Sequence, residues 1–404
     1  MNQRTHARIL RAATLLVVPA AALVAADARA DVVTDLTTNE VDPSVAYNPE
    51  DDEFLVVWES RDTFGGANIL GRRYDGSGQP LGNPFGVAVD LAADDRSPAV
   101  AFNPLTHGFV VAYVHDDGDA DVRVREVPSS SMVVLQPFDV AIADDPGVDE
   151  TAPQLAFNPV AGTFALTYVH EYSAIDHDIY AVRFSATTGA VSGVALGIAT
   201  SSADQSAPDI ACSPVSAQCR VVFEELSGPG PEGVATRAFD ASAGALTSPI
   251  ASLGREPGAH YAPTIAVDDG GEYLALWEHV GTQDTNVIGV EIASQGQINL
   301  FTTVIASSAS NEGEPDVAFD PVAEVFRVVW AQDGGTQGSY DVWTRDVSKT
   351  GNPDVPHAVA TSSRDDVRPA VAAGSSPGMA VWEHIFTPGG FFSPPDTDIH
   401  IGAL

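Results

Sequence analysis

A sevenfold repeat constrains the fold of this 404-residue chain more than any other feature. Each copy begins with a proline that an alanine follows three positions later, and successive prolines are 55, 55, 55, 55, 52 and 54 residues apart. The prolines are Pro43, Pro98, Pro153, Pro208, Pro263, Pro315 and Pro369. Because a single copy is too small to bury its apolar residues alone, the copies should stack on one another in a repeat architecture.

Each copy contains four short apolar segments that are typical of β-strands. In the third copy these segments include "APQLAF", "FALTYVH", "DIYAVRF" and "GVALGIA", with Asn-Pro and Gly turns near their ends. The segments lack a helical period, and four short strands in each repeat are typical of a β-propeller blade. We predict an all-β fold, a seven-bladed β-propeller with four antiparallel strands per blade. The blades should start near residues 42, 97, 152, 207, 262, 314 and 368, with each proline at the start of an innermost edge strand.

The two ends of the repeat region predict how the ring closes. The seventh copy ends after its third strand, in "DTDIHIGAL", whereas the segment at 31–43 resembles the fourth-strand segment that precedes the last copy. The N-terminal strand should therefore complete blade seven, so that residues 31–404 form a single propeller without an unpaired blade.

Residues 1–30 have the features of a secretory signal peptide. Arg4, Arg8 and Arg11 precede an apolar run, and Ala28-Arg29-Ala30 provides a small-residue cleavage site before Asp31. No later segment approaches the roughly 20 apolar residues that a membrane span requires. We expect cleavage after Ala30, a bacterial protein that is secreted or periplasmic, no insertion into a membrane, and a monomer.

The charge of the chain excludes one class of partner. The formal net charge is -36, and Lys349 is the only lysine. Such a field repels phosphate backbones, so we expect no binding to nucleic acid. It favours solubility in a salty or extracellular medium, or the attraction of a cationic ligand or metal.

The only two cysteines, Cys212 and Cys219, occupy a defined place in the repeat. They stand four and eleven positions after Pro208, where other copies carry aromatic pairs such as Tyr47 and Phe54. Facing residues of adjacent antiparallel strands are within disulfide range, and an exported protein is oxidised. We predict a structural disulfide; a free thiol pair and a metal half-site are the alternatives.

A second column of polar residues lies two positions after the aromatic residue that ends each second strand. Its members are Ser60, His115, His170, Glu225, His279, Gln332 and His384. The functional interpretation is a candidate ligand ring of His115, His170, Glu225, His279 and His384, since imidazole binds metals and titrates near neutral pH. The structural interpretation is that each side chain bonds to loop backbone within its own blade.

The third strands begin mostly with Asp or Asn, which commonly stabilise turns. The second copy is exceptional, because "HDDGDADV" places Asp116, Asp117, Asp119 and Asp121 in one loop. Oxygen ligands at this density could hold Ca²⁺, although the spacing matches no EF-hand. We predict that no cofactor is required, and calcium bound at this loop is the alternative.

The repeat also resembles known families. An Asn-Pro or Asp-Pro turn, an apolar strand that ends in an aromatic residue, and a following "DIY" or "DV" resemble the repeats of TolB-type bacterial propellers. The "VVWE...DIxxxR" blocks resemble repeats of secreted bacterial surface proteins. The resemblance covers all seven copies and implies the propeller fold, but its motifs are structural and the copies are longer than the TolB-type repeat.

The sequence carries no common catalytic motif. It lacks a Gly-x-Ser-x-Gly elbow, a His-Glu-x-x-His motif and a P-loop. We therefore expect a non-catalytic scaffold that binds an unknown protein or glycan through acidic loops on one face of the ring. One alternative is an extracellular polymer hydrolase or lyase that uses carboxylates or a divalent ion at the channel mouth. Another is a calcium-stabilised structural module of the cell envelope.

Overall fold

The computed structural model describes most of the chain after the predicted signal peptide. The described residues are 31–33, 38–130, 138–226, 233–254, 256–299, 302–334, 339–374, 378–387 and 396–404. The predicted signal peptide at 1–30 lies outside them. The described part of the chain is all-β, and it has no helix long and apolar enough to cross a membrane.

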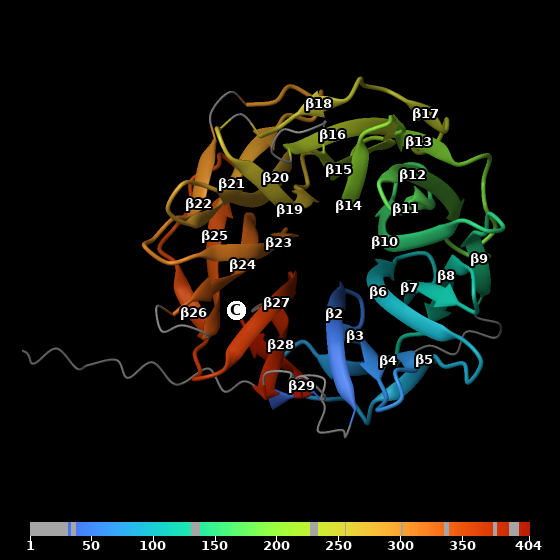
Figure 1. The fold of residues 1–404 in the computed structure, drawn as a ribbon, viewed down its shortest axis with the longest axis horizontal. Coiled ribbons are helices and arrows are strands. Elements are labelled where there is room, and N and C mark those ends of the chain that lie inside the picture. The colour runs from blue at the N-terminus through green and yellow to red at the C-terminus, as the bar shows by residue number, and fades with distance from the viewer. Residues whose placement is uncertain are drawn as a thin grey trace, which may run out of the picture.

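Seven antiparallel sheets surround a common axis in a ring (Figure 1). Each sheet runs from an innermost strand beside the axis to an outermost strand at the rim. The innermost strands are β2 (Asn39–Asn48), β6 (Asp94–Asn103), β10 (Asp149–Asn158), β14 (Asp204–Cys212), β19 (Ala259–Val267), β23 (Glu312–Asp320) and β27 (Asp365–Ala372). The second strands are β3 (Glu53–Arg61), β7 (Gly108–Asp116), β11 (Thr163–Ser173), β15 (Gln218–Leu226), β20 (Tyr273–Val280), β24 (Val325–Asp333) and β28 (Met379–Thr387).

The outer half of each blade holds a long third strand and a short fourth strand. The third strands are β4 (Ala67–Asp75), β8 (Ala120–Val127), β12 (Asp176–Ser185), β16 (Gly233–Asp240), β21 (Thr285–Ile292), β25 (Tyr340–Ser348) and β29 (Asp396–Ala403). The fourth strands are β5 (Phe85–Ala88), β9 (Asp139–Ala143), β13 (Leu196–Ala199), the split pair β17 (Ala245–Leu246) and β18 (Ala251–Ser252), β22 (Thr303–Ala306), β26 (His357–Ala360) and β1 (Asp31–Val32).

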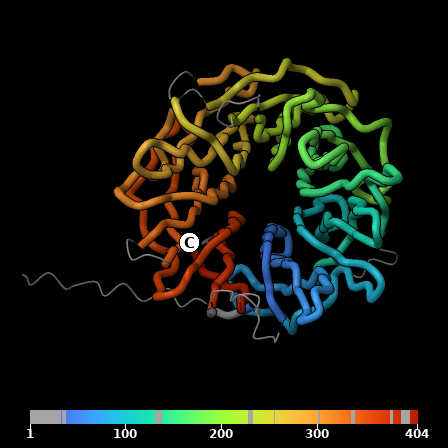
Figure 2. The backbone as a smooth tube through the Cα atoms, viewed as in Figure 1, coloured from blue at the N-terminus to red at the C-terminus, as the bar shows by residue number. Residues whose placement is uncertain are grey.

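The N-terminal strand closes the ring, as predicted. The sheet of blade seven has the order β1-β29-β28-β27, and Asp31 and Val32 of β1 pair with Ile401 and His400 of β29. The first and last blades consequently lie side by side, and the blue and red parts of the chain adjoin in the ring (Figure 2).

The core lies between the blades. On β3, Leu55 and Val57 join one apolar cluster with residues of blade two, whereas Val56 and Trp58 join another with residues of blade seven. All four side chains are fully buried. Successive strand residues point to opposite faces of a sheet, so a second strand packed between two neighbouring blades must be apolar at every position.

The innermost strands begin three or four residues before the prolines. In blade one the strand begins at Asn39, and its register shifts between Val41 and Ser44, so that Pro43 lies in a β-bulge. The same shift occurs in every blade. The residue before each proline has φ between 46° and 51°, namely Asp42, Ser97, Ala152, Ala207, Ala262, Glu314 and Arg368. The bulge holds a backbone conformation that non-glycine residues seldom adopt.

The predicted disulfide is confirmed, and it lies at the position of a cross-strand pair in the first hairpin of its blade. Tyr47 faces Phe54 across β2 and β3, with ring centroids 4.7 Å apart. Cys212 and Cys219 occupy the equivalent position of blade four and form a disulfide. In blade four the disulfide therefore takes the place of the aromatic contact that blade one makes at the same position.

Candidate functional site

Each blade carries a row of polar residues across its first three strands. The row starts three positions before the proline, at a residue whose side chain is almost fully buried. These residues are Glu40, Asp95, Glu150, Gln205, His260, Glu312 and Asp366. On the second strand, the cross-strand neighbour of each is a member of the predicted polar column. That member is in turn the cross-strand neighbour of the Asp, Asn or Gly near the start of the third strand. No sequence motif marks this position as buried, although its fixed distance from the proline is a signal that could have revealed it.

All four predicted ring histidines form local hydrogen bonds, and three of them bond to a single hydrogen-bond partner. His115 Nδ1 lies 2.7 Å from Asp95 Oδ1, and His384 Nδ1 lies 2.7 Å from Asp366 Oδ1. His279 Nε2 donates to the Pro257 carbonyl oxygen at 3.2 Å. These bonds orient the imidazoles locally and do not direct them to a shared ligand.

Glu225 is the non-histidine member of the predicted ring. It lies partly exposed on β15 and faces Gln205 across the first hairpin of blade four. The five candidate residues therefore occupy five separate blades, and the structure brings no two of them together.

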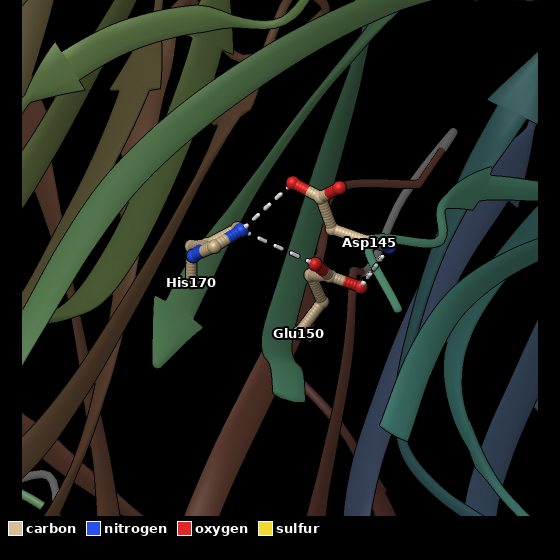
Figure 3. Close-up of side chains that lie close together, drawn as sticks. All are labelled: Asp145, Glu150 and His170. Atoms are coloured by element: carbon tan, nitrogen blue, oxygen red, sulfur yellow. Dashed lines mark hydrogen bonds and ion pairs between the residues drawn. The ribbon is translucent and has the colours of Figure 1, made fainter. Parts of the chain in front are cut away.

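His170 has a different environment (Figure 3). Its Nε2 lies 3.3 Å from Asp145 Oδ2 and 3.5 Å from Glu150 Oε1. Glu150 comes from β10, His170 from β11, and Asp145 from the loop that joins β9 to β10. Within the part of the chain that the structure describes, this is the one cluster of three or more His, Cys, Asp or Glu residues whose ligand atoms all lie within 4.8 Å of one another.

The cluster joins two buried side chains to one exposed side chain. Glu150 is 0% exposed and His170 6%, whereas the Asp145 side chain is 75% exposed. Burial raises the pKa of Glu150 to about 8, and the nearby negative charges of Asp121, Asp145 and Asp119 add to this effect. Solvent thus reaches the cluster on the side of Asp145.

Two tyrosines hold the imidazole of His170 in place. The ring centroid of Tyr172 lies 4.4 Å from that of His170, and the centroid of Tyr180 lies 5.4 Å away. The hydroxyl groups of the two tyrosines are 3.1 Å apart. This aromatic contact leaves Nε2 directed at the two carboxylates.

The four aspartates of the predicted calcium loop have separate partners. Asp116 forms an ion pair with Arg96 and accepts a hydrogen bond from the Gly118 amide at 3.0 Å. Asp119 accepts one from the Gly147 amide at 2.9 Å, and Asp121 faces His115 across β7 and β8. Asp117 is exposed. The structure does not gather these four carboxylates into one cluster, and calcium binding there stays a prediction.

A second candidate site lies on the axis of the ring. The residues around the seven prolines line a cavity of about 520 Å³, among them Asp209 and Asp316, which directly follow Pro208 and Pro315. Thr264, at the same position of the intervening blade, also lines the cavity. Three consecutive blades therefore contribute polar side chains to one side of the channel.

The hydroxyl group of Thr264 links the two carboxylates. Thr264 Oγ1 lies 3.0 Å from Asp209 Oδ2 and 3.2 Å from Asp316 Oδ1. A hydroxyl group has one proton and can donate it to only one carboxylate, so the other contact is a hydrogen bond only when that carboxyl is itself protonated. Burial, together with the negative charge of Asp209, raises the pKa of Asp316 to about 7, and burial also raises the pKa of Asp209.

Backbone amides of the following blades fix both carboxylates. Asp209 Oδ2 accepts a hydrogen bond from the Ile265 amide at 2.8 Å, and Asp316 Oδ2 accepts one from the Val371 amide at 2.7 Å. Ser44, at the same position of blade one, accepts one from the Val100 amide at 3.2 Å. In these three blades the residue after the proline thus connects adjacent blades, and in two of them this residue is an acid in the channel.

Comparisons with known proteins show the fold. No family model matches the sequence, and no curated protein matches it. A polysaccharide lyase, an ulvan lyase of family PL25, is 10% identical over 93% of this chain and 96% of its own, with a TM-score of 0.60. A protein of unknown function from Dyadobacter fermentans is 9% identical over 91% of this chain and 95% of its own, with a TM-score of 0.51. At these identities the likeness extends to the propeller architecture alone, and the resemblance to TolB-type repeats stays a prediction.

Proposed function

We propose that this protein is an exported glycoside hydrolase that cleaves a neutral or cationic polysaccharide at the mouth of the central channel. The pair of channel acids, Asp209 and Asp316, carries the proposal because the two carboxyl groups flank one hydroxyl group, and both can bond to it only when one carboxyl is itself protonated. That a polysaccharide lyase adopts this fold also supports a carbohydrate substrate. The disulfide supports export, since such bonds persist in oxidising compartments.

Hydrolysis of a glycosidic bond requires one protonated and one ionised carboxyl group. Asp316, whose pKa is about 7, is the general acid and gives its proton to the leaving-group oxygen as the bond from the anomeric carbon breaks. Asp209 is the nucleophile: its carboxylate oxygen forms a bond to that carbon as the leaving-group bond breaks, and a water molecule deprotonated by Asp316 then displaces Asp209 from the carbon. Two coupled carboxyl groups that hold one proton near neutral pH meet this requirement together.

The charge of the protein favours a hydrolase over a lyase. A lyase cleaves beside the carboxylate of a uronic acid, so its polymer is anionic. This chain has a net charge of -36, and the one cation among the described residues that line the cavity, Arg368, is paired with Asp42 and Glu383. An anionic polymer would be repelled, whereas a neutral polymer or one with amino groups could approach.

A binding scaffold is the second candidate function, and one observation favours it. Asp209 and Asp316 each accept a backbone hydrogen bond from the next blade, a role that maintains the ring without catalysis. In that case the acidic loops would bind a protein or glycan, and the channel acids would matter for stability alone.

Variants of the two acids separate these functions. We expect the wild-type protein to release reducing ends from neutral or amino-sugar polysaccharides, and Asp209→Asn and Asp316→Asn each to lower kcat by about 10² to 10⁴-fold. Ser44→Ala is the matched control, because it removes an inter-blade contact of the same kind without removing an acid.

Three outcomes would contradict the proposal. Equal loss of activity in Ser44→Ala and in the Asp variants would mean that the acids act through the fold. Release of unsaturated products from uronate polymers, seen by ultraviolet absorbance, would establish a lyase instead. Binding of a glycan without any cleavage would favour the scaffold.

A further inference from the structure

We propose that Asp145, Glu150 and His170 form a binding site for Zn²⁺ or a similar transition-metal ion, with a fourth coordination position open to solvent. The site is separate from the channel acids and does not depend on the proposed hydrolase activity. Its three ligands would attach the loop between β9 and β10 to the first two strands of blade three.

The geometry of His170 differs from that of its sister histidines. His115 and His384 each present Nδ1 to one carboxylate at 2.7 Å, the usual length of a charged hydrogen bond. His170 instead presents Nε2 to two carboxylates at 3.3 and 3.5 Å. Ligands about 2.0 to 2.2 Å from a tetrahedral zinc ion are about 3.3 to 3.6 Å from one another. The spacing at His170 therefore matches the edges of a coordination shell; of the two contacts, the one with Asp145 is also within hydrogen-bond range and the one with Glu150 is not a hydrogen bond.

An unsatisfied buried carboxylate oxygen points into the same space. Glu150 is fully buried, yet its Oε1 atom has no hydrogen-bond partner among the described residues. This atom is the one that lies 3.5 Å from His170 Nε2 (Figure 3). Burial of a polar group without a partner costs about 1 to 3 kcal/mol, more when it is charged, and a bound cation would offset that cost.

The donor set selects the class of metal. Ca²⁺ and Mg²⁺ prefer shells made wholly of oxygen, whereas one imidazole with two carboxylates suits zinc and its neighbours in the first transition row. Three protein ligands leave one tetrahedral position for water. The exposed side chain of Asp145 lies on the solvent side of the cluster, so an ion can enter without disturbing the core.

The test measures zinc binding by untagged, chelator-treated protein with isothermal titration calorimetry and thermal unfolding. We expect the wild-type protein to bind one zinc ion per chain with a rise in Tm. Asp145→Asn should weaken zinc binding by about tenfold or more. Substitution of a residue that only hydrogen-bonds to a metal ligand already costs at least that much affinity, and Asp145 would be a ligand itself. The Asp145 side chain is largely exposed, so this variant should fold normally.

Two controls share features of the site but lack its geometry. Asp144→Asn makes the same change of charge at the adjacent exposed residue, and His115→Gln alters a sister histidine that contacts a single carboxylate. Both should bind zinc like the wild type, and a Co²⁺-loaded wild-type protein should show the intense visible absorption of a tetrahedral site.

Three results would overturn the inference: no zinc binding by the wild-type protein, equal binding by wild type and Asp145→Asn, or a Tm that responds to Ca²⁺ and not to Zn²⁺. Asp209→Asn should leave zinc binding unchanged, so a failure of this inference is distinguishable from a failure of the proposed hydrolase.

Discussion

At the scale of single residues, Asp316 couples the chemistry of the channel to the stability of the ring. Its carboxyl group faces Asp209 of β14 and Thr264 of β19, and the same cavity also contains Glu314, Arg368 and Asp42. Burial and the charge of Asp209 raise its pKa from 3.8 to about 7. The folded protein therefore binds a proton at this site under conditions in which the unfolded chain releases it.

The sign of the resulting pH dependence follows from linkage. Between pH 3.8 and about 7 the folded state holds more protons at Asp316 than the unfolded state does, so this residue makes the free energy of unfolding fall as the pH rises. We expect Asp316→Asn to flatten the dependence in this interval, since Asn does not titrate. Urea unfolding of both proteins at constant ionic strength measures the two slopes. Equal slopes would show that Asp316 titrates normally.

Sequence patterns were enough to align the polar columns of the seven blades, but not to predict which of their residues have an unusual environment. The Pro-based alignment placed His170 correctly in a column with three other histidines, and nothing in that column distinguished it. The difference lies in Asp145, a loop residue whose approach to the imidazole depends on the path between two blades. Asp209 and Asp316 were missed because the position after the proline also holds Ser44 and Thr264, so its residue type varies with the blade.

At the scale of the elements, a glutamate connects the second strand of one blade to the bulge of the next in four places. Glu59, Glu224, Glu278 and Glu383 each directly follow a buried aromatic residue of a second strand, and each accepts a hydrogen bond from the backbone N–H of the residue before a proline. Blades two and three carry Val114 and Val169 in this place. In some blades only, therefore, the bulge residue with positive φ donates its backbone N–H to a glutamate of the neighbouring blade.

Glu278 provides a clear test of this contact. Its Oε1 accepts the Glu314 amide at 2.6 Å, while burial raises the pKa of Glu278. We expect Glu278→Met to lower the free energy of unfolding by about 1 to 3 kcal/mol, because the amide loses its acceptor. Glu278→Gln keeps an oxygen there and should lose much less. Denaturant unfolding compares the two variants, and equal losses would mean that packing and not the hydrogen bond is responsible.

At the scale of the whole molecule, the repeat made the architecture predictable. Seven evenly spaced prolines, apolar second strands and an incomplete last copy were enough to predict seven blades and closure by the N-terminal strand, and the disulfide followed from the aromatic pairs of the sister blades. The bulge before each proline was not predictable, since no glycine marks the positive φ. Local conformation there is set by contacts between blades, which a sequence pattern does not record.

Closure through β1 should determine both the stability and the association state of the ring. Val33, just after β1, is 2% exposed; its amide donates to the Ile399 carbonyl oxygen at 2.8 Å, and its carbonyl oxygen accepts from Arg72 of blade one at 2.9 Å. This short segment therefore contacts both the last and the first blade. Without it, the outer edge of β29 would expose unpaired backbone groups that can pair with another chain.

We expect a chain that begins after residue 33 to unfold at a lower temperature and to form dimers or larger species through β29. Val33→Asp should destabilise the full ring by about 2 to 4 kcal/mol, because it buries a charge in an apolar cluster. Val89→Asp is the matched control, since Val89 is 57% exposed after a fourth strand of the adjacent blade. Thermal unfolding and sedimentation velocity measure the two effects. A truncated chain that stays monomeric with an unchanged Tm would show that contacts between β2 and β27 suffice to close the ring.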